Sequence, residues 1–168
     1  MHEKLNDERL IVSVSGGKDS TAMCLYLFEL GYTKSDFDRV FMDTGWEYKA
    51  TYDYLDELES TVGKIIRLKA NIPVKEEDSE LVQHYEDRLG FESPFLRLVF
   101  QYNSFPNNVV KWCTRQLKIA PIKKYYESLD YDFVNLVGIR REESRRRSQM
   151  VELEWSDGFD CYVWRPLI

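Results

Sequence analysis

A glycine pair between an apolar segment and an amphipathic segment constrains this chain more than any other feature. Ile11–Ser20 reads I-V-S-V-S-G-G-K-D-S, and Thr21–Leu30 continues with apolar residues at helical spacing. This order predicts a β-strand, a tight turn and an α-helix. Gly16 and Gly17 carry no Cβ and tolerate positive φ angles, so backbone N–H groups can close around the oxygen atoms of a ligand. The segment therefore predicts an anion-binding turn.

The charges around this turn favour a phosphate or pyrophosphate group. The helix that follows points its positive end and its unpaired N–H groups toward the turn. Lys18 adds a full charge, which attracts an anion about 4 Å away by roughly 4 kcal/mol before desolvation is subtracted. Ser15 and Ser20 add hydroxyl donors. The alternative is a plain turn in which Asp19 or Ser20 only caps the helix.

The turn fits neither of the two commonest phosphate-binding motifs. The Walker A motif needs four residues between its glycines and a Lys-Ser/Thr pair after the second, and the dinucleotide fingerprint needs three glycines. The sequence S-G-G-K-D-S has neither arrangement. A plain turn remains the weaker reading, because the lysine, aspartate and serines accompany the glycines directly after an apolar strand.

Length and composition indicate one domain that spans residues 1–168. A chain of 168 residues buries roughly 70% of its unfolded surface in a single core. The net charge of −6 argues against a general nucleic-acid coat protein. The charged N-terminus is unlike a signal peptide, and no apolar run reaches the roughly 20 residues needed to span a bilayer. We therefore expect a soluble cytoplasmic protein without a membrane partner.

The cysteines do not form the pattern of a disulfide framework or of a metal site. Cys24, Cys113 and Cys161 are three in number and include no C-x-x-C pair. The sequence thus indicates neither disulfides nor a self-contained zinc site or iron–sulfur cluster. Cys24 lies among apolar helix residues, so we expect a buried structural thiol.

A second strand, Asp38–Met42, ends in the tetrapeptide D-T-G-W at residues 43–46. In an open parallel sheet, ligands gather at the carboxyl ends of the strands. Asp43, Thr44 and Gly45 at that edge suit recognition of an adenosine, and Trp46 offers a flat apolar surface. The alternative is an ordinary strand-to-helix turn.

The middle of the chain carries no clear chemistry. Residues 48–61 have the apolar stripe of a helix, and residues 64–68 form a third predicted strand. From about 70 to 108 the pattern loosens, with a charged helix over Glu76–Arg88 and many aromatic residues over Phe91–Tyr102. We interpret residues 70–108 as a helical insertion.

The last third of the chain gathers basic side chains. W-C-T-R-Q-L-K at residues 112–118 opens a predicted helix that runs to about Ser128, and Arg115 and Lys118 can share one of its faces. A fourth strand, Asp132–Val137, leads to Gly138 and to the segment R-R-E-E-S-R-R-R at residues 140–147. Residues 161–168 form a last extended segment.

Arginine binds phosphate and sulfate bidentately, so Arg140 and Arg147 are candidates for gripping a polyanionic ligand. Two other readings of residues 140–147 stay open, namely a nucleic-acid-facing patch and an ordinary salt-bridged helix.

Together, S-G-G-K-D-S, D-T-G-W, W-C-T-R-Q-L-K and G-I-R-R-E-E-S-R-R-R resemble the phosphoadenosine phosphosulfate reductase family, a branch of the PP-loop ATP pyrophosphatases, from about Leu10 to Leu167. The resemblance implies a Rossmann-like adenine nucleotide α-hydrolase fold, an α/β architecture with a mostly parallel five-stranded sheet between helices. It also implies three groups of binding residues. The phosphates would contact Ser15, Gly16, Gly17, Lys18, Asp19 and Ser20, the nucleoside would contact Asp43, Thr44 and Gly45, and the anion end would contact Arg115, Lys118, Gly138, Arg140, Ser144 and Arg147.

The family resemblance also divides the expected activities. Reductases of the family carry a nucleophilic cysteine in a C-terminal tail, or cysteine pairs that bind an iron–sulfur cluster, and this sequence shows neither. Its motifs are more similar to the small subunit of bacterial sulfate adenylyltransferase and to members involved in DNA sulfur modification. That similarity implies cleavage of ATP between its α and β phosphates, giving AMP or an adenylylated product and pyrophosphate. Sulfur metabolism or nucleic-acid sulfur modification would be the setting.

In this scheme, Lys18 and Mg²⁺, held in part by Asp19, would stabilise the leaving pyrophosphate, and Arg140 and Arg147 would clamp an oxyanion or nucleobase acceptor. Two alternatives stay open: reduction of an adenylyl sulfate-type nucleotide with an external thiol, and a catalytically silent nucleotide-binding subunit. A protein partner, a homo-oligomer and a nucleic-acid partner stay open as well. Cys113 is read as a lone, partly buried thiol, the alternative being a ligand of a cluster completed elsewhere.

Overall fold

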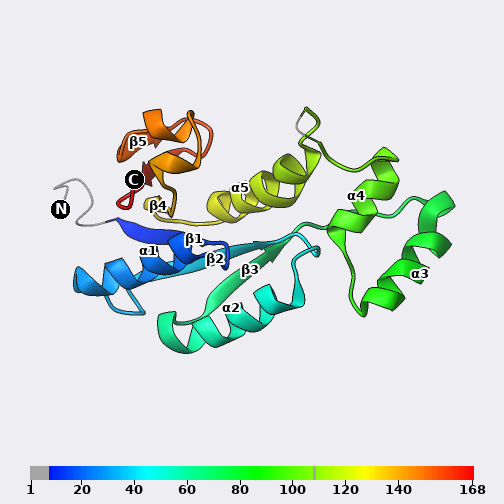
Figure 1. The fold of residues 1–168 in the computed structure, drawn as a ribbon, viewed down its shortest axis with the longest axis horizontal. Helices are drawn as coiled ribbons and strands as arrows, with labels where there is room; N and C mark the ends of the chain where they lie inside the picture. Colours follow the sequence, from blue (N-terminus) through cyan, green and yellow to red (C-terminus); the bar gives the residue numbers. More distant parts are fainter. Residues whose placement is uncertain (1–7, 108) are drawn as a thin grey trace. The chain divides into compact units, whose positions relative to one another are not determined.

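The computed structural model describes residues 8–107 and 109–168 of the chain (Figure 1). The charged N-terminal residues that the sequence analysis contrasted with a signal peptide lie, up to Asp7, outside the described part. Within the described residues, no helix has both the length and the apolar character needed to cross a membrane. Strands and helices alternate through the first half of the chain, as the sequence predicts.

The described residues divide into two compact units. The first contains the residues up to Phe41 together with Lys49–Ile66 and Ser128–Ile168, and the second contains Met42–Tyr48 and Arg67–Glu127. The described residues of the predicted insertion at residues 70–108 all lie in the second unit. The glycine turn lies in the first.

The sheet is mostly parallel and has six strands in the order β3-β2-β1-β4-β6-β5. Strand β1 pairs in parallel with β2 and β4, and β4 pairs in parallel with β6, whereas β5 is antiparallel to β6. The bounds are β1 Arg9–Val14, β2 Phe37–Asp43, β3 Ile65–Lys69, β4 Phe133–Val137, β5 Leu153–Ser156 and β6 Cys161–Trp164. This arrangement confirms the predicted α/β class with a mostly parallel sheet.

The strand that sequence analysis missed is β5, and its residues explain why. Leu153–Ser156 reads L-E-W-S and is only partly buried, without the apolar run of a central strand. Its partner β6 lies between β4 and β5, so β5 is an edge strand that needs no apolar face on both sides.

Strand β1 is a central strand of the sheet and lies in the core of the first unit. Leu10, Ile11, Val12 and Val14 are all at most 1% exposed, so β1 is buried on both faces, as a central parallel strand is. Helix α1, Lys18–Glu29, packs Met23, Cys24 and Leu27 into the same core as β1, and helix α2, Lys49–Val62, adds Leu55 and Leu58. Each such side chain contributes roughly 1.5–3 kcal/mol by burial. The predicted structural role of Cys24 is thus confirmed.

The second unit is helical and is built around a smaller core. Its helices are the 3₁₀ turn η2 (Glu76–Asp78), α3 (Ser79–Leu89), α4 (Pro94–Tyr102), the π-helix η3 (Thr114–Ile119) and α5 (Ala120–Glu127). Leu98 and Leu117 are fully buried there beside Trp112. The Trp112 ring stacks on Tyr102 with 5.5 Å between centroids, so the aromatic residues of this region form structure rather than a loose loop.

Helix α4 begins at a signal that is readable in the sequence. Ser93 is the N-cap and accepts a hydrogen bond from the backbone N–H of Leu96, and Pro94 occupies the first helical position. Asn103 ends the helix in the left-handed region with φ 49°. The predicted helix at residues 112–128 is present as η3 followed by α5, so its first half is wound more loosely than an α-helix.

Candidate functional site

The turn after β1 has the geometry that its glycines predict. Gly16 has φ +74°, and a Cβ at this position would lie 3.0 Å from Cγ2 of Thr51. Gly16 is therefore required both by its backbone conformation and by the close approach of α2. Gly17 is the extended N-cap of α1, and the helix begins at Lys18.

Hydrogen bonds within the turn fix its backbone conformation. The Ser20 hydroxyl donates to the Gly17 carbonyl oxygen at 2.9 Å, and its oxygen accepts from the backbone N–H of Ser15 at 3.1 Å. Ser20 is only 4% exposed. We expected Ser20 to donate to phosphate, whereas its hydroxyl proton is directed to Gly17, so Ser20 fixes the shape of the turn.

Donors remain at the rim of this turn. The N–H of Thr21 bonds to the Gly17 carbonyl oxygen at 3.2 Å, so the N–H groups of the helical residues before Thr21 have no acceptor within the helix. Lys18 is exposed and forms no ion pair with any residue the structure describes. Backbone N–H groups at a helix start and a nearby ammonium group are features that favour the binding of an anion.

The turn after β4 packs directly against this helix start. A Cβ on Gly138 would lie 2.7 Å from the backbone oxygen of Asp19 and 2.9 Å from the backbone nitrogen of Ser20. Only glycine fits such a backbone-to-backbone approach without displacement. Gly138 was expected beside the ligand, and its first role is to place residues 138–140 against the first turn of α1.

This packing brings together two residues that were predicted from distant motifs. Arg140 Nε lies 2.9 Å from Asp19 Oδ1, with the side chains 40% and 23% exposed. The N–H of Arg140 does not point at the oxygen, so the contact is an ion pair and not an aligned hydrogen bond. The metal candidate and the acceptor-clamping candidate are therefore direct neighbours.

The same contact limits how Mg²⁺ would be held. No group of three or more His, Cys, Asp or Glu side chains in the described residues could hold a metal ion. Asp19 offers a single carboxylate, already neutralised by Arg140. Mg²⁺ commonly binds through one or two carboxylates plus substrate phosphates and water. Asp19 therefore fits an ion that arrives with a nucleotide, and not a resident metal ion.

Two short 3₁₀ turns, η4 (Arg141–Glu143) and η5 (Arg147–Gln149), carry the last two candidates: Ser144 directly follows η4 as its C-cap, and Arg147 begins η5. The Ser144 Oγ accepts a hydrogen bond from the backbone N–H of Arg147 at 3.2 Å. Arg147 also pairs with Glu143 one turn earlier. Ser144 thus stabilises the backbone of its own segment, and the charge of Arg147 is neutralised by the Glu143 carboxylate.

In the second unit, hydrogen bonds stabilise the D-T-G turn. Asp43 Oδ1 accepts the Gly45 N–H at 2.9 Å, and the Thr44 hydroxyl donates to Glu47 Oε1 at 2.7 Å. Gly45 has φ +69°, and its carbonyl oxygen accepts from the Ser93 hydroxyl at 2.6 Å. Thr44 is 7% exposed, so its hydroxyl faces the protein. The side chains of Asp43 and Thr44 therefore stabilise the turn itself through these hydrogen bonds.

A buried ion pair that sequence analysis missed holds this turn. Glu86 is 5% exposed, bonds to Arg97 at 2.8 and 2.9 Å, and accepts the Ser93 N–H at 2.8 Å. Burial raises the pKa of Glu86, but the bonds from Arg97 and Ser93 outweigh burial and leave the pKa lowered. The Ser-Pro start of α4 was the one signal that could have pointed to Ser93.

An apolar hollow of about 320 Å³ lies beside the D-T-G-W turn within the second unit. Its walls are Trp46, Tyr85, Leu89 and Leu96, with Arg88 at its edge. The Trp46 ring stacks on Phe95 with 5.0 Å between centroids and an interplanar angle of 20°. A flat aromatic ligand such as a nucleobase matches such a wall.

Arg115 and Lys118 are exposed on the π-helix η3 of the second unit. The π-helix bonds i to i+5, so residues three apart are turned further from each other than on the α-helix we expected. Cys113 precedes them and is partly buried, as predicted. Asp43, Thr44 and Gly45 belong to this unit too, whereas Ser15–Ser20, Gly138, Arg140, Ser144 and Arg147 belong to the first.

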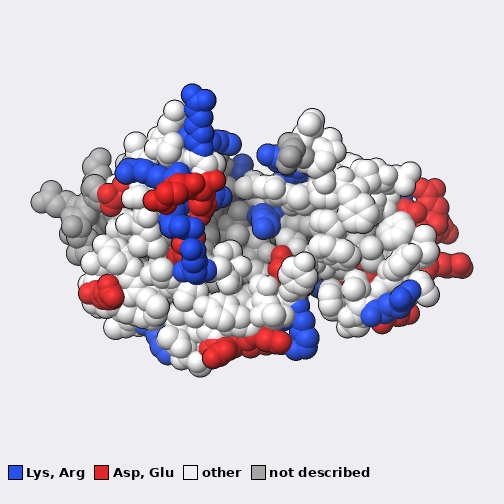
Figure 2. All heavy atoms as spheres, in the orientation of Figure 1, with Lys and Arg blue, Asp and Glu red and all other residues white. Residues whose placement is uncertain are grey.

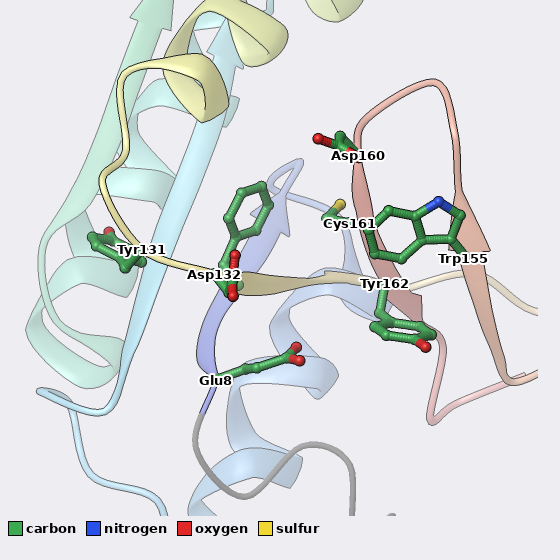
Figure 3. A pocket seen from close by; sticks show the side chains of 8 residues that line it. Glu8, Tyr131, Asp132, Trp155, Asp160, Cys161 and Tyr162 are labelled. Atoms are coloured by element: carbon green, nitrogen blue, oxygen red, sulfur yellow. The ribbon is translucent and has the colours of Figure 1, made fainter.

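Another hollow lies in the first unit, at the amino ends of the strands (Figure 3). It measures about 170 Å³, and the carboxylates of Glu8, Asp132 and Asp160 precede β1, β4 and β6 there. Burial raises the pKa of the Cys161 thiol in its wall to about 11. The amino ends of parallel strands face away from the glycine turn, so this hollow is separate from the candidate site.

A mostly parallel sheet between helices, with a glycine turn after the central strand β1, defines a Rossmann-like α/β fold. The family model for the phosphoadenosine phosphosulfate reductase domain matches residues 9–168. The chain therefore belongs to this family, as its motifs predicted.

Several proteins are similar to this chain. An uncharacterized 37.8 kDa protein of Escherichia phage 186 is 28% identical over 94% of the chain and 56% of its own length. An uncharacterized protein of Methanocaldococcus jannaschii is 33% identical over 88% of the chain and 26% of its own length. A nin region protein of Escherichia phage lambda is 27% identical over 81% of the chain and 49% of its own length. The chain thus spans between about a quarter and just over half of these relatives.

Among solved structures, the crystal structure of Candida glabrata FMN adenylyltransferase in complex with FMN and an ATP analogue is similar, with a TM-score of 0.49 and 15% sequence identity. The match covers 99% of this chain and 45% of that chain.

Proposed function

We propose that this protein binds ATP at the turn formed by Ser15–Ser20 and cleaves it between the α and β phosphates. The observation that carries the proposal is the turn itself: Gly16 at φ +74°, unpaired N–H groups at the start of α1, and a free Lys18. Membership of the phosphoadenosine phosphosulfate reductase family supports an adenine nucleotide as the ligand.

In this proposal the chain's own residues bind and position the triphosphate. The N–H groups at the start of α1 and the Lys18 ammonium group hold the β and γ phosphates, where charge grows as pyrophosphate leaves. A nucleophilic atom of the acceptor bonds to the α phosphorus, and the bond from that phosphorus to the bridging α–β oxygen breaks. Mg²⁺ that arrives with ATP would supply further neutralisation of pyrophosphate, with Asp19 as its one carboxylate contact in the turn.

Arg140 would link the binding of the ATP phosphates to the binding of the acceptor. Its guanidinium lies against Asp19 in the structure, so it is already at the helix start where the phosphates would bind. If Asp19 turns to a metal ion, Arg140 is released and can clamp an anionic acceptor. Arg147, which pairs with Glu143, would provide the second clamp.

Replacing Lys18 by alanine tests phosphate binding separately from nucleoside binding. A charged hydrogen bond contributes roughly 1.5–3 kcal/mol, so we expect the affinity for ATP to fall by about 10–100-fold. Adenosine, which has no phosphate, should bind equally well to both proteins. Isothermal titration calorimetry measures both ligands, and Lys64→Ala, at another exposed lysine, is the control. Equal ATP affinity in the Lys18 variant and the parent would refute the assignment.

The reaction itself is tested with ATP labelled at the α phosphorus, incubated with Mg²⁺ and a panel of oxyanion and nucleic-acid acceptors. Labelled AMP or a labelled adenylylated product, with pyrophosphate released, supports the proposal. Tight binding of adenylyl sulfate without ATP turnover would instead support a reductase that uses an external thiol. Nucleotide binding without any chemistry would support a silent subunit.

A further inference from the structure

The segment after the Gly138 turn is strongly basic in an otherwise acidic protein. Residues 140–147 contain five arginines and two glutamates, a net charge of +3 in a chain of net charge −6. Figure 2 shows Lys and Arg side chains gathered over the turns η4 and η5, with acidic side chains among them.

The segment is a defined structure and not a loose loop. The backbone N–H of Ser148 bonds to the Ser144 carbonyl oxygen at 3.0 Å, and the Ser148 hydroxyl donates to the Arg145 carbonyl oxygen at 2.8 Å. The N–H of Met150 bonds to the Arg147 carbonyl oxygen at 3.1 Å. These bonds fix the backbone from which the arginines project.

Only two of the five arginines are neutralised by a carboxylate. Arg140 pairs with Asp19 and Arg147 with Glu143. Arg141, Arg145 and Arg146 are exposed and have no carboxylate within ion-pair distance among residues 8–107 and 109–168. An ordinary salt-bridged surface would pair these charges, so three guanidinium groups are left for a ligand.

We propose that Arg141, Arg145 and Arg146 bind the phosphodiester backbone of a nucleic acid. A single sulfate or phosphate is satisfied by one or two arginines, the number that Arg140 and Arg147 would provide in the proposed function. Three further guanidinium groups match a ligand with repeating phosphates, and arginine is the side chain best suited to bind them. Residues 140–147 include no apolar side chain that could enter a bilayer.

The position of the segment gives this surface a role in the reaction, and this part rests on the proposed function. Gly138 and Arg140 join the segment to the first turn of α1 within the first unit. A strand bound along the arginines would therefore pass the place where ATP is held. A nucleic acid would then be the acceptor: one of its oxygen or nitrogen atoms bonds to the α phosphorus, pyrophosphate leaves, and the acceptor's proton goes to solvent.

The test measures binding of fluorescently labelled 20-nucleotide single strands and duplexes by anisotropy at several salt concentrations. Arg141→Gln/Arg145→Gln/Arg146→Gln removes three charges from the surface, and Lys64→Gln/Lys111→Gln/Lys124→Gln removes three exposed charges elsewhere. For single strands each phosphate contact contributes about 0.7 to the salt slope, so the arginine variant should lose roughly 2 from the slope. The lysine variant should keep the slope of the parent.

Three results would overturn the proposal: no binding by the parent at 50 mM salt, equal losses in both variants, or stronger binding to anionic lipid vesicles or acidic peptides than to nucleic acid. Unfolding temperatures of all variants check that they fold. ATP calorimetry on the same proteins separates the two proposals. Parent protein that binds ATP but no nucleic acid rejects only this inference, and binding of nucleic acid without ATP rejects only the proposed function.

Discussion

Replacing Gly138 by alanine probes the contact that joins the two strand-end turns. A Cβ at this position would meet three backbone atoms of α1 at 2.7, 2.8 and 2.9 Å, whereas ordinary contacts begin at 3.4 Å. The two backbones must therefore separate by about 0.7 Å, because no flexible side chain is available to yield. Overpacking of this kind costs roughly 1–3 kcal/mol.

The displaced atoms belong to Asp19 and Ser20, so the cost falls on the turn itself. We expect Gly138→Ala to lose about 1–3 kcal/mol in the free energy of unfolding. The affinity for ATP should also fall by about tenfold or more, because the N–H groups at the start of α1 are moved. Urea denaturation measures the first quantity and isothermal titration calorimetry the second.

Gly158→Ala is the matched control. Gly158 is also outside the left-handed region, and the nearest atom to its Cβ would be Ser156 Oγ at 3.8 Å, an ordinary contact. This variant should keep the stability and the ATP affinity of the parent. If Gly138→Ala behaved like Gly158→Ala in both assays, the close approach of the two turns would be refuted.

Two further predictions concern charge and thiol chemistry in the first unit. Arg9 donates hydrogen bonds to both Asp38 oxygens at 2.9 Å and lowers the pKa of Asp38. The pair therefore stabilises the fold at pH values above the ordinary carboxyl pKa, and this contribution is lost as the pH falls through the lowered pKa of Asp38. Asp38→Asn should be less stable than the parent by about 1 kcal/mol at pH 7, and the difference should shrink as the pH falls through the lowered pKa of Asp38. A difference that urea denaturation finds independent of pH would contradict this. Burial raises the pKa of Cys24 and of Cys161 to about 11, so these thiols should react slowly at pH 8. Alkylation at that pH, followed by mass spectrometry, should therefore modify the partly buried Cys113 first. Equally rapid modification of either buried thiol would disprove their protection.

The parts of the structure that were predictable are those in which a short segment determines its own conformation. The glycine turn after β1 is one case, because only glycine adopts φ +74° without strain at residue 16. The apolar run of β1 and the stripe of α1 are others, since each pattern follows directly from burial on the sheet. The resemblance to the family further predicted which of these segments would contribute to one binding site.

The parts that were missed are those in which the residue types fit more than one role or in which the partner is distant in sequence. The role of Ser20 in the turn could not be read from S-G-G-K-D-S, because a serine there serves equally well as a phosphate donor or as an internal bond. Glu86 lay in a predicted charged helix with no sign of a partner, yet it is buried, pairs with the half-buried Arg97 and accepts a hydrogen bond from Ser93. Edge strand β5 had no apolar pattern of its own.

The contact between Arg140 and Asp19 shows the same limit. Both residues were singled out, but 121 positions separate them, and only the close approach at Gly138 makes them neighbours. The sequence therefore identified the charged groups, and the fold determined which of them are in contact.

A crystal structure of the protein with a non-hydrolysable ATP analogue and Mg²⁺ tests the central claim most directly. We predict that oxygens of the β and γ phosphates lie about 2.7–3.2 Å from backbone nitrogens between Gly17 and Ser20, and that Lys18 Nζ contacts the same phosphates. Phosphates bound elsewhere in the crystal, or a turn that stays free of them at saturating analogue, would contradict the account.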